Sequence, residues 1–221
     1  MPIDTTTALI TDIGAIDWNN LAAVTATSEK LLTTLDADRT LLRELTERAL
    51  ANPDLLPLCE HYDILDKIVL HDDPSGWRLR LHIFLPGYFD RPHNHRWTYR
   101  SRILHGSYTH TLYGTDDQLD NDRLDVTALQ PRMVRTESTG DTYTLHHTMI
   151  HSVTAHPYTT SLIIRGPAVK DRFLVTDRTT GQTWWQHGAA TESPDDAARK
   201  RMNTTQATTC LTKLTELGVL T

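Results

Sequence analysis

The sequence predicts a mainly β fold, a β-barrel or jelly roll with a helical segment before it and a helix after it. Residues from about 15 to 66 carry apolar side chains at helical spacing, and residues 67–186 change to the period of strands with frequent turn signals. Many short antiparallel strands after a helical segment favour one barrel with helices packed outside. We expect one domain with three parts: a helical segment at 1–66, the barrel at 67–186 and a C-terminal helical segment at 187–221.

The helices are predicted from apolar spacing and from their caps. Asp38 is placed to cap a helix that ends before Pro53. The apolar residues of that helix recur three and four positions apart on one face: Leu41, Leu42, Leu45, Ala49 and Leu50. Near the end of the chain, Ser193 is followed directly by Pro194 and three positions later by Asp196, which is typical of a helix start.

The middle of the chain is predicted to form strands. Residues 77–85 alternate strictly between apolar and polar types, as in a half-buried strand. We expect Arg80, His82 and Phe84 to line the barrel, while the leucine face of the same strand packs on the helices. Further strands are expected at 101–113, 124–129, 133–137, 142–145, 151–155, 161–165 and 173–176.

Composition excludes several classes of protein. The 221 residues include 22 Lys and Arg against 28 Asp and Glu, a net charge of −6, which argues against a dedicated binder of nucleic acid or of anionic membranes. No apolar run approaches the roughly 20 residues of a membrane helix, and the first residues lack the pattern of a secretory signal. Cys59 and Cys210 are too few for a disulfide framework. We therefore expect a cytoplasmic protein.

The most informative feature is a set of histidines in two stretches. His93 and His95 are two residues apart, so on a strand they share a face and can present both imidazoles to one metal ion. Residues 140–153 can bring a third imidazole from a neighbouring strand. Three neutral nitrogen ligands leave open positions opposite them, which a catalytic metal needs. A single His-x-His pair also arises by chance, so the surrounding spacing decides between the two interpretations.

That spacing resembles the cupin superfamily. The first cupin motif is a glycine, two histidines, a fourth ligand position and a closing glycine, and its members here are Gly87, His93, His95, Tyr99 and Gly106. The interval from Gly140 to His151 reproduces the second motif. The resemblance covers about residues 65–170 and implies a small β-barrel with a metal in its mouth.

The sequence departs from the cupin pattern at the fourth ligand. Tyr99 replaces the usual glutamate, so the resemblance implies a site of three histidines: His93, His95 and His151. Three-histidine cupins with a helical N-terminal segment resemble the thiol dioxygenases, of which cysteine dioxygenase is the familiar member. By that resemblance the three histidines hold Fe(II), and O2 and substrate take the open positions.

The resemblance also places the substrate. Lys67 falls about where the thiol dioxygenases have the arginine that grips the substrate carboxylate. Some of these enzymes carry a cysteine–tyrosine cross-link, and Arg100 and Arg165 stand at the two cross-link positions here. The pocket therefore differs from theirs, with cations in place of the cross-link.

Arginines in a cavity need anionic partners, because an unpaired buried charge is costly. We place Arg100 and Arg102 on the inner face of the strand that follows the histidines. The partners are either internal carboxylates or a substrate that carries carboxylates or a phosphate, held by the fork of the guanidinium. We expect a substrate at Arg100 and Arg165 and leave both alternatives open at Arg80 and Arg102.

These observations lead to a mononuclear metal enzyme as the main functional hypothesis, most simply a non-haem Fe(II) oxygenase acting on a small anionic, amino-acid-like substrate. The substrate-binding candidates are Arg100, Arg165, Lys67, Arg80 and Arg102, and the proton-transfer candidates are Tyr99, His82 and Tyr143. One alternative is a zinc or other divalent-metal cupin that couples or isomerises amino-acid-derived substrates. Another is a non-catalytic ligand-binding cupin. We expect no nucleic-acid or membrane partner, and a monomer or homodimer.

Overall fold

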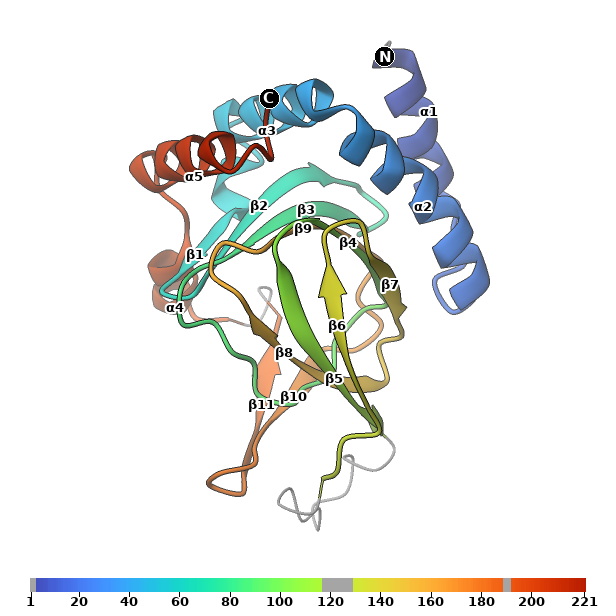
Figure 1. Cartoon of the computed structure of the whole chain (residues 1–221), viewed down its shortest axis with the longest axis vertical. Coiled ribbons are helices and arrows are strands. Elements are labelled where there is room, and N and C mark those ends of the chain that lie inside the picture. The colour runs from blue at the N-terminus through green and yellow to red at the C-terminus, as the bar shows by residue number, and fades with distance from the viewer. Residues whose placement is uncertain (1–2, 117–128, 189–191) are drawn as a thin grey trace.

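Most helices lie on one side of the structure, which is a computed structural model that describes residues 3–116, 129–188 and 192–221 (Figure 1). They are α1 (Ile3–Gly14), α2 (Leu21–Ala37), α3 (Arg39–Ala51), the short 3-10 turn η1 (Leu56–Leu58), α4 (Pro194–Lys200) and α5 (Thr204–Glu216). The two predicted caps are confirmed. Asp38 accepts a hydrogen bond from the backbone N–H of Leu41 at 2.9 Å, and Ser193 accepts one from that of Asp196 at 3.1 Å.

The larger β-sheet has six antiparallel strands in the order β1-β2-β3-β9-β4-β7. They are β1 (Glu60–Tyr62), β2 (Leu65–Asp72), β3 (Arg78–Phe84), β9 (Thr160–Arg165), β4 (Tyr99–His105) and β7 (Thr142–Leu145). Leu79, Leu81 and Ile83 of β3 belong to the apolar cluster that includes leucines of α3 and α5, as the alternation predicts. The outer face of this sheet therefore carries the helices.

The smaller sheet has the order β6-β5-β8, and a separate hairpin is formed by β10 and β11. The strands are β5 (Ser107–Thr115), β6 (Met133–Ser138), β8 (Met149–Ala155), β10 (Arg172–Asp177) and β11 (Gln182–His187). The segment 89–95 lies between these two groups. His93 forms one backbone bridge with His151 of β8 and another with Val175 of β10. This segment therefore joins the hairpin to the smaller sheet.

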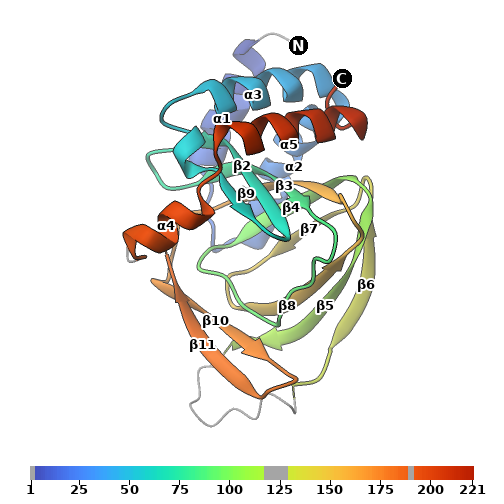
Figure 2. The same ribbon diagram turned by 90° about the vertical axis from the view of Figure 1, so that its left-hand side faces the viewer.

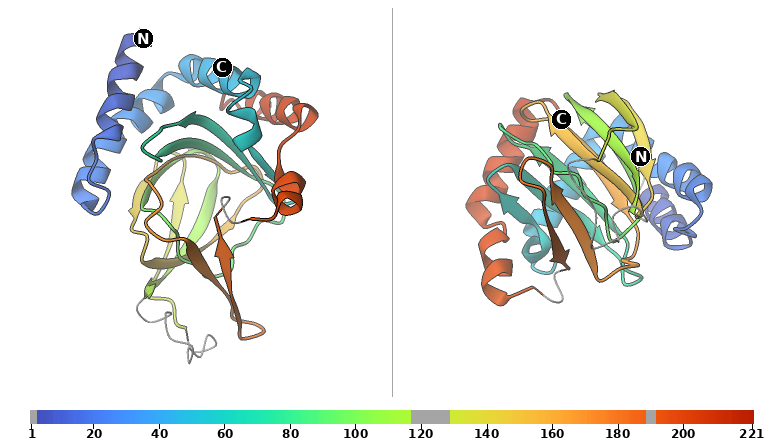
Figure 3. Two further views of the ribbon diagram at one scale, coloured as in Figure 1. Left: turned by 180° about the vertical axis from the view of Figure 1, so that it is seen from behind. Right: turned by 90° about the horizontal axis from the view of Figure 1, so that it is seen from below.

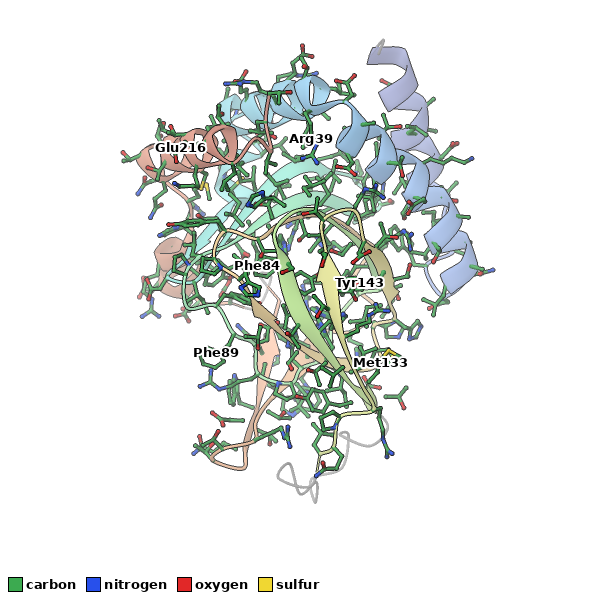
Figure 4. All side chains as sticks on the ribbon, viewed as in Figure 1. Arg39, Phe84, Phe89, Met133, Tyr143 and Glu216 are labelled. Atoms are coloured by element: carbon green, nitrogen blue, oxygen red, sulfur yellow. The ribbon has the colours of Figure 1, made fainter. Side chains whose placement is uncertain are left out.

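The two sheets face each other across a second apolar cluster, as Figure 2 shows from the side. Phe84 and Tyr99 of the larger sheet pack there with Tyr108 and Val153 of the smaller sheet. The view from behind and the view from below show the helices outside the sheets (Figure 3). In Figure 4, Phe84 lies between the sheets, whereas Phe89 projects at the edge and is 54% exposed. The predicted fold class is confirmed: mainly β, with facing antiparallel sheets and helices at both ends.

Several expected elements differ in detail. The strand expected at 101–113 is two strands, β4 and β5, because Gly106 turns the chain with a φ of +76°. The strand expected at 124–129 lies almost entirely outside the described residues. Strand β11 was not expected, and its Trp184 and Trp185 are partly exposed on a hairpin. Among the described residues, no helix is long and apolar enough to cross a membrane.

Candidate metal centre

Three histidines meet where the segment 89–95 runs beside β8. One ligand nitrogen from each of His93, His95 and His151 lies within 4.8 Å of the other two. The backbones of His93 and His151 hydrogen-bond to each other in both directions, each N–H to O distance being 2.9 Å. His95 follows two positions later, so its ring returns to the same face. The three residues predicted as metal ligands are thus brought together.

Two of the three imidazoles are held in the neutral form that a metal requires. Burial lowers the pKa of His95 and His151 well below the ordinary value, and the neighbouring His93 lowers both further. Both rings are therefore neutral near pH 7. His93 donates through Nδ1 to the carbonyl oxygen of Arg91 at 2.8 Å, so its Nε2 atom is left with a free lone pair. The Nε2 atoms of His95 and His151 face each other at 2.7 Å.

A buried chain of hydrogen bonds orients His151 from behind. The His151 Nδ1 atom lies 2.9 Å from Nε2 of His110, and His110 Nδ1 lies 3.2 Å from a carboxylate oxygen of Glu137. Glu137 can only accept, so His110 donates through Nδ1 and accepts through Nε2. His151 therefore donates through Nδ1, and its Nε2 atom carries no proton. His110 is fully buried and Glu137 is 4% exposed.

The donor set fits a divalent transition metal. Three neutral imidazoles suit iron and zinc alike, and two of the three rings have the outer hydrogen bonds that usually hold metal-binding histidines in position. Tyr99 stands at the fourth ligand position in place of a carboxylate, and its hydroxyl lies 3.4 Å from that of Tyr143. The site is therefore one of three histidines.

The predicted proton-transfer residues lie around this centre. The ring of Tyr99 is 4.9 Å from that of His95, and Tyr143 accepts a hydrogen bond from Tyr108 at 2.7 Å. Burial raises the pKa of Tyr99 and Tyr143, so both phenols stay protonated. His82 is buried on the inner face of β3. Its pKa lies well below the ordinary value, through burial first and then the charges of Lys67 and Arg80.

Lys67 lies on the same inner wall, but it already has an anionic partner. Its Nζ atom donates to Glu60 at 3.1 Å and stands over the ring of Tyr62. Glu60 also pairs with Lys200 at 3.1 Å, which brings the C-terminal segment into this wall. The sequence analysis did not identify Glu60 or Lys200, since neither belongs to a motif.

The expected placement of Arg100 and Arg102 is wrong. Tyr99, Ser101 and Ile103 occupy the inner face of β4, so the two arginines between them face α2. Arg100 pairs there with Glu29 and donates to Thr142 and Thr144, while Arg102 pairs with Asp36 at 2.6 Å and with Glu29 at 3.3 Å. The carboxylates of α2 offer these two arginines anionic partners. The inner face of β4, which carries Tyr99, Ser101 and Ile103, offers none.

Arg80 and Arg165 do lie on the inner face. Arg80 is on β3, on the same side as His82 and Phe84, as the alternation predicts. Arg165 ends β9 and donates through Nη1 to the carbonyl oxygens of Gly76 and Gly166 at 2.8 and 2.9 Å. Both guanidinium groups stand beside the ring of Trp97, whose own ring is 6.2 Å from that of His95.

Facing antiparallel sheets with three converging histidines define a mainly β protein with a candidate mononuclear metal centre. No family model and no curated protein sequence matches this chain. Among solved structures, it is similar to KdgF from Halomonas sp., with 18% identity, a TM-score of 0.37, and coverage of 48% of this chain and 82% of that one. It is also similar to an RmlC-like cupin from Shewanella frigidimarina, with 15% identity, a TM-score of 0.39, and coverage of 51% and 86%. The DMSP lyase DddQ from Ruegeria pomeroyi has 12% identity, a TM-score of 0.39, and coverage of 52% of each chain.

Proposed function

We propose that this chain is a mononuclear metal-dependent enzyme, a non-haem Fe(II) oxygenase that acts on a small carboxylate-bearing, amino-acid-like substrate. The observation that carries the proposal is the convergence of His93, His95 and His151, with hydrogen bonds that place the ring proton of His93 and of His151 on Nδ1 and leave Nε2 without one. When bound, Fe(II) supplies open coordination positions for O2 and for the substrate. The resemblance of the two motifs to three-histidine cupins supports the same assignment.

The chain's own residues would fix the metal ligands and manage protons. Tyr99 keeps its proton because burial raises its pKa, and its hydroxyl is only loosely engaged with Tyr143 at 3.4 Å. The protonated hydroxyl can therefore donate a hydrogen bond beside the histidines. His82 is neutral and its Nε2 atom has no hydrogen-bond partner among the described residues, so it is open to a hydrogen bond with a bound molecule.

Metal analysis tests this proposal most directly. Protein purified without added metal is expected to contain iron, one ion per chain, and to consume O2 when an amino-acid-like substrate is supplied. His93→Ala, His95→Ala and His151→Ala should each lose the metal, because each removes one of three ligands. His156→Ala, at an exposed position, is the matched control and should keep it.

Each other outcome changes the proposal in a defined way. Full occupancy by zinc with no O2 consumption would replace the oxygenase by a non-redox metal enzyme. Metal retained in all three histidine variants would refute the ligand assignment. Failure to bind any divalent metal would leave only a ligand-binding protein.

A further inference from the structure

Two arginines on the inner wall have no anionic partner among the residues that the structure describes. Arg80 and Arg165 are 9% and 7% exposed, and the Nε atom of each is buried without a hydrogen-bond partner. Their guanidinium carbons lie 5.7 and 4.7 Å from the centre of the Trp97 ring. A cation–ring contact contributes much less free energy than the removal of a charge from water costs. The aromatic ring therefore does not replace a counterion.

The carboxylates near this pair are engaged elsewhere. Glu60, the acidic group whose charge acts most strongly on Arg80, already pairs with Lys67 and Lys200 at 3.1 Å each. Lys200 also pairs with Glu192. Taken together, Lys67 and Lys200 balance these two carboxylates, so the charges of the two arginines remain uncompensated.

The electrostatics of Arg165 agree with this charge count. Its pKa is lowered to about 8, first by burial and then by the charges of Arg80 and Arg78. Arg78 is itself paired with Asp72 through two hydrogen bonds. The wall beside Trp97 is therefore locally cationic in a protein whose net charge is −6.

Two uncharged polar atoms on the same wall are also left without partners. The Nε2 atom of His82 and the Oγ atom of Ser161 are buried and have no hydrogen-bond partner among the described residues. The two residues face each other across the β3–β9 pairing. Buried polar atoms are nearly always bonded, so several open positions on one inner wall indicate that a polar molecule binds there.

From these contacts we infer that Arg80 and Arg165 form an anion-binding subsite and that its ligand is a small molecule with two negative charges. Each guanidinium presents a fork that matches a carboxylate or phosphate group, and two uncompensated cations call for two negative charges. The subsite stands on these contacts alone. The statement that this ligand is the substrate rests on the proposed function. It adds a second anionic group to the carboxylate-bearing substrate proposed there.

Calorimetric titration of the full chain with succinate, inorganic phosphate and acetate tests this subsite. Succinate is expected to bind at least tenfold more tightly than acetate, and Arg80→Met and Arg165→Met should each weaken succinate binding about tenfold or more, the loss of one charge-assisted pair. Arg100→Met is the matched control. Arg100 is equally buried but pairs with Glu29 on the outer face, so succinate binding should change less than about twofold. Tighter binding of phosphate than of succinate would identify the ligand group as a phosphate and keep the subsite.

Three results would overturn the inference: acetate binding as tightly as succinate, equal weakening by Arg100→Met, or unchanged affinity in Arg80→Met and Arg165→Met. Arg80→Lys and Arg165→Lys keep the charge and guard against unfolding of the methionine variants; they should bind succinate with intermediate affinity. A purely structural Arg165 would lower the melting temperature on substitution and leave succinate affinity intact. His93→Ala separates the two proposals, because it removes metal binding but should leave succinate binding in place.

Discussion

At the scale of single residues, the tautomer of one histidine decides whether the centre can hold a metal. His151 must offer Nε2, and it does so because Nδ1 donates to His110, which in turn donates to Glu137. Arg135 pairs with the same carboxylate and holds it in place. Each hydrogen bond in the series His151–His110–Glu137 has one direction. If the direction of either bond were reversed, the proton would lie on the wrong nitrogen of His151.

We predict that His110→Gln and Glu137→Gln each weaken binding of Zn²⁺ or Co²⁺ by about 10–100-fold, the usual effect of losing an outer hydrogen-bond partner of a ligand. Competition with a chromogenic chelator measures the affinity, and the visible spectrum of bound Co²⁺ reports any change in ligand geometry. His156→Gln, at the exposed position, should change neither. An unaltered metal affinity in both buried variants would mean that the hydrogen bonds through His110 and Glu137 do not position His151.

The residues of the centre differ in how well the sequence reveals them. His93 and His95 are predicted by the two-residue period of strands, and His151 by the resemblance of its interval from Gly140 to the second cupin motif. His110 is invisible to such patterns, since only the pairing of β5 with β8 places it behind His151. Arg100 shows the opposite error. Its sequence position predicted a side chain on the inner face of β4, but Tyr99 and Ile103 occupy that face and Arg100 faces α2.

At the scale of elements, charged pairs hold α2 against β4. Glu29 contacts both Arg100 and Arg102, and Asp36 contacts Arg102 as well. Arg100 is 6% exposed, so removal of its carboxylate partner would leave a buried charge unpaired. The helix is therefore fixed on the larger sheet by electrostatics in addition to apolar packing.

Glu29→Gln should lower the free energy of unfolding by about 1–2 kcal/mol at pH 7; the full cost of an unpaired buried charge is reduced because Glu29 is 37% exposed. Burial alone would raise the pKa of Glu29, but the hydrogen bond and charge of Arg100 outweigh it and lower the pKa. This stabilisation is present above the unfolded pKa and is lost as the pH falls through the lowered folded pKa.

Urea unfolding at several pH values measures this effect. The difference between wild type and Glu29→Gln should shrink as the pH falls from the ordinary glutamate pKa through the lowered pKa of Glu29 in the folded protein. The control is Glu47→Gln, which breaks an exposed pair with Arg43 on α3 and should cost less than about 0.5 kcal/mol. A pH-independent difference for Glu29→Gln would attribute the loss to packing.

At the scale of the whole molecule, the larger sheet separates two different interiors. Its helical side carries the large apolar cluster with both cysteines and, at β4, the ion pairs to α2, whereas its inner side carries the unpartnered polar groups near the site. Alternation along β3 predicted this division, because a strand with leucines on one face and Arg80, His82 and Phe84 on the other must lie between unlike surroundings. The pairing of Lys200 with Glu60 could not be predicted, since it depends on how distant segments meet.

The buried thiols provide a test of how the C-terminal segment is docked. Burial raises the pKa of Cys59 and of Cys210, and Cys210 also donates to Asp66 of β2 at 3.2 Å. Both thiols should therefore resist iodoacetamide in the native protein and react at the rate of free cysteine in urea. Mass spectrometry of the alkylated peptides measures this. Rapid labelling of Cys210 alone under native conditions would show that α5 detaches from the sheet.

The backbone position of His93 couples metal binding to the packing of the β10–β11 hairpin. This residue bridges β8 on one side and β10 on the other, so it lies at the seam where the hairpin meets the smaller sheet. Two of the ligand histidines thus come from the two sides of one backbone pairing. Any ion that binds them preferentially in the folded state adds its binding free energy to stability. A bound ion would therefore stabilise the pairing of the 89–95 segment with β8 and β10. Metal binding and the packing of the hairpin on the smaller sheet would then be coupled through His93.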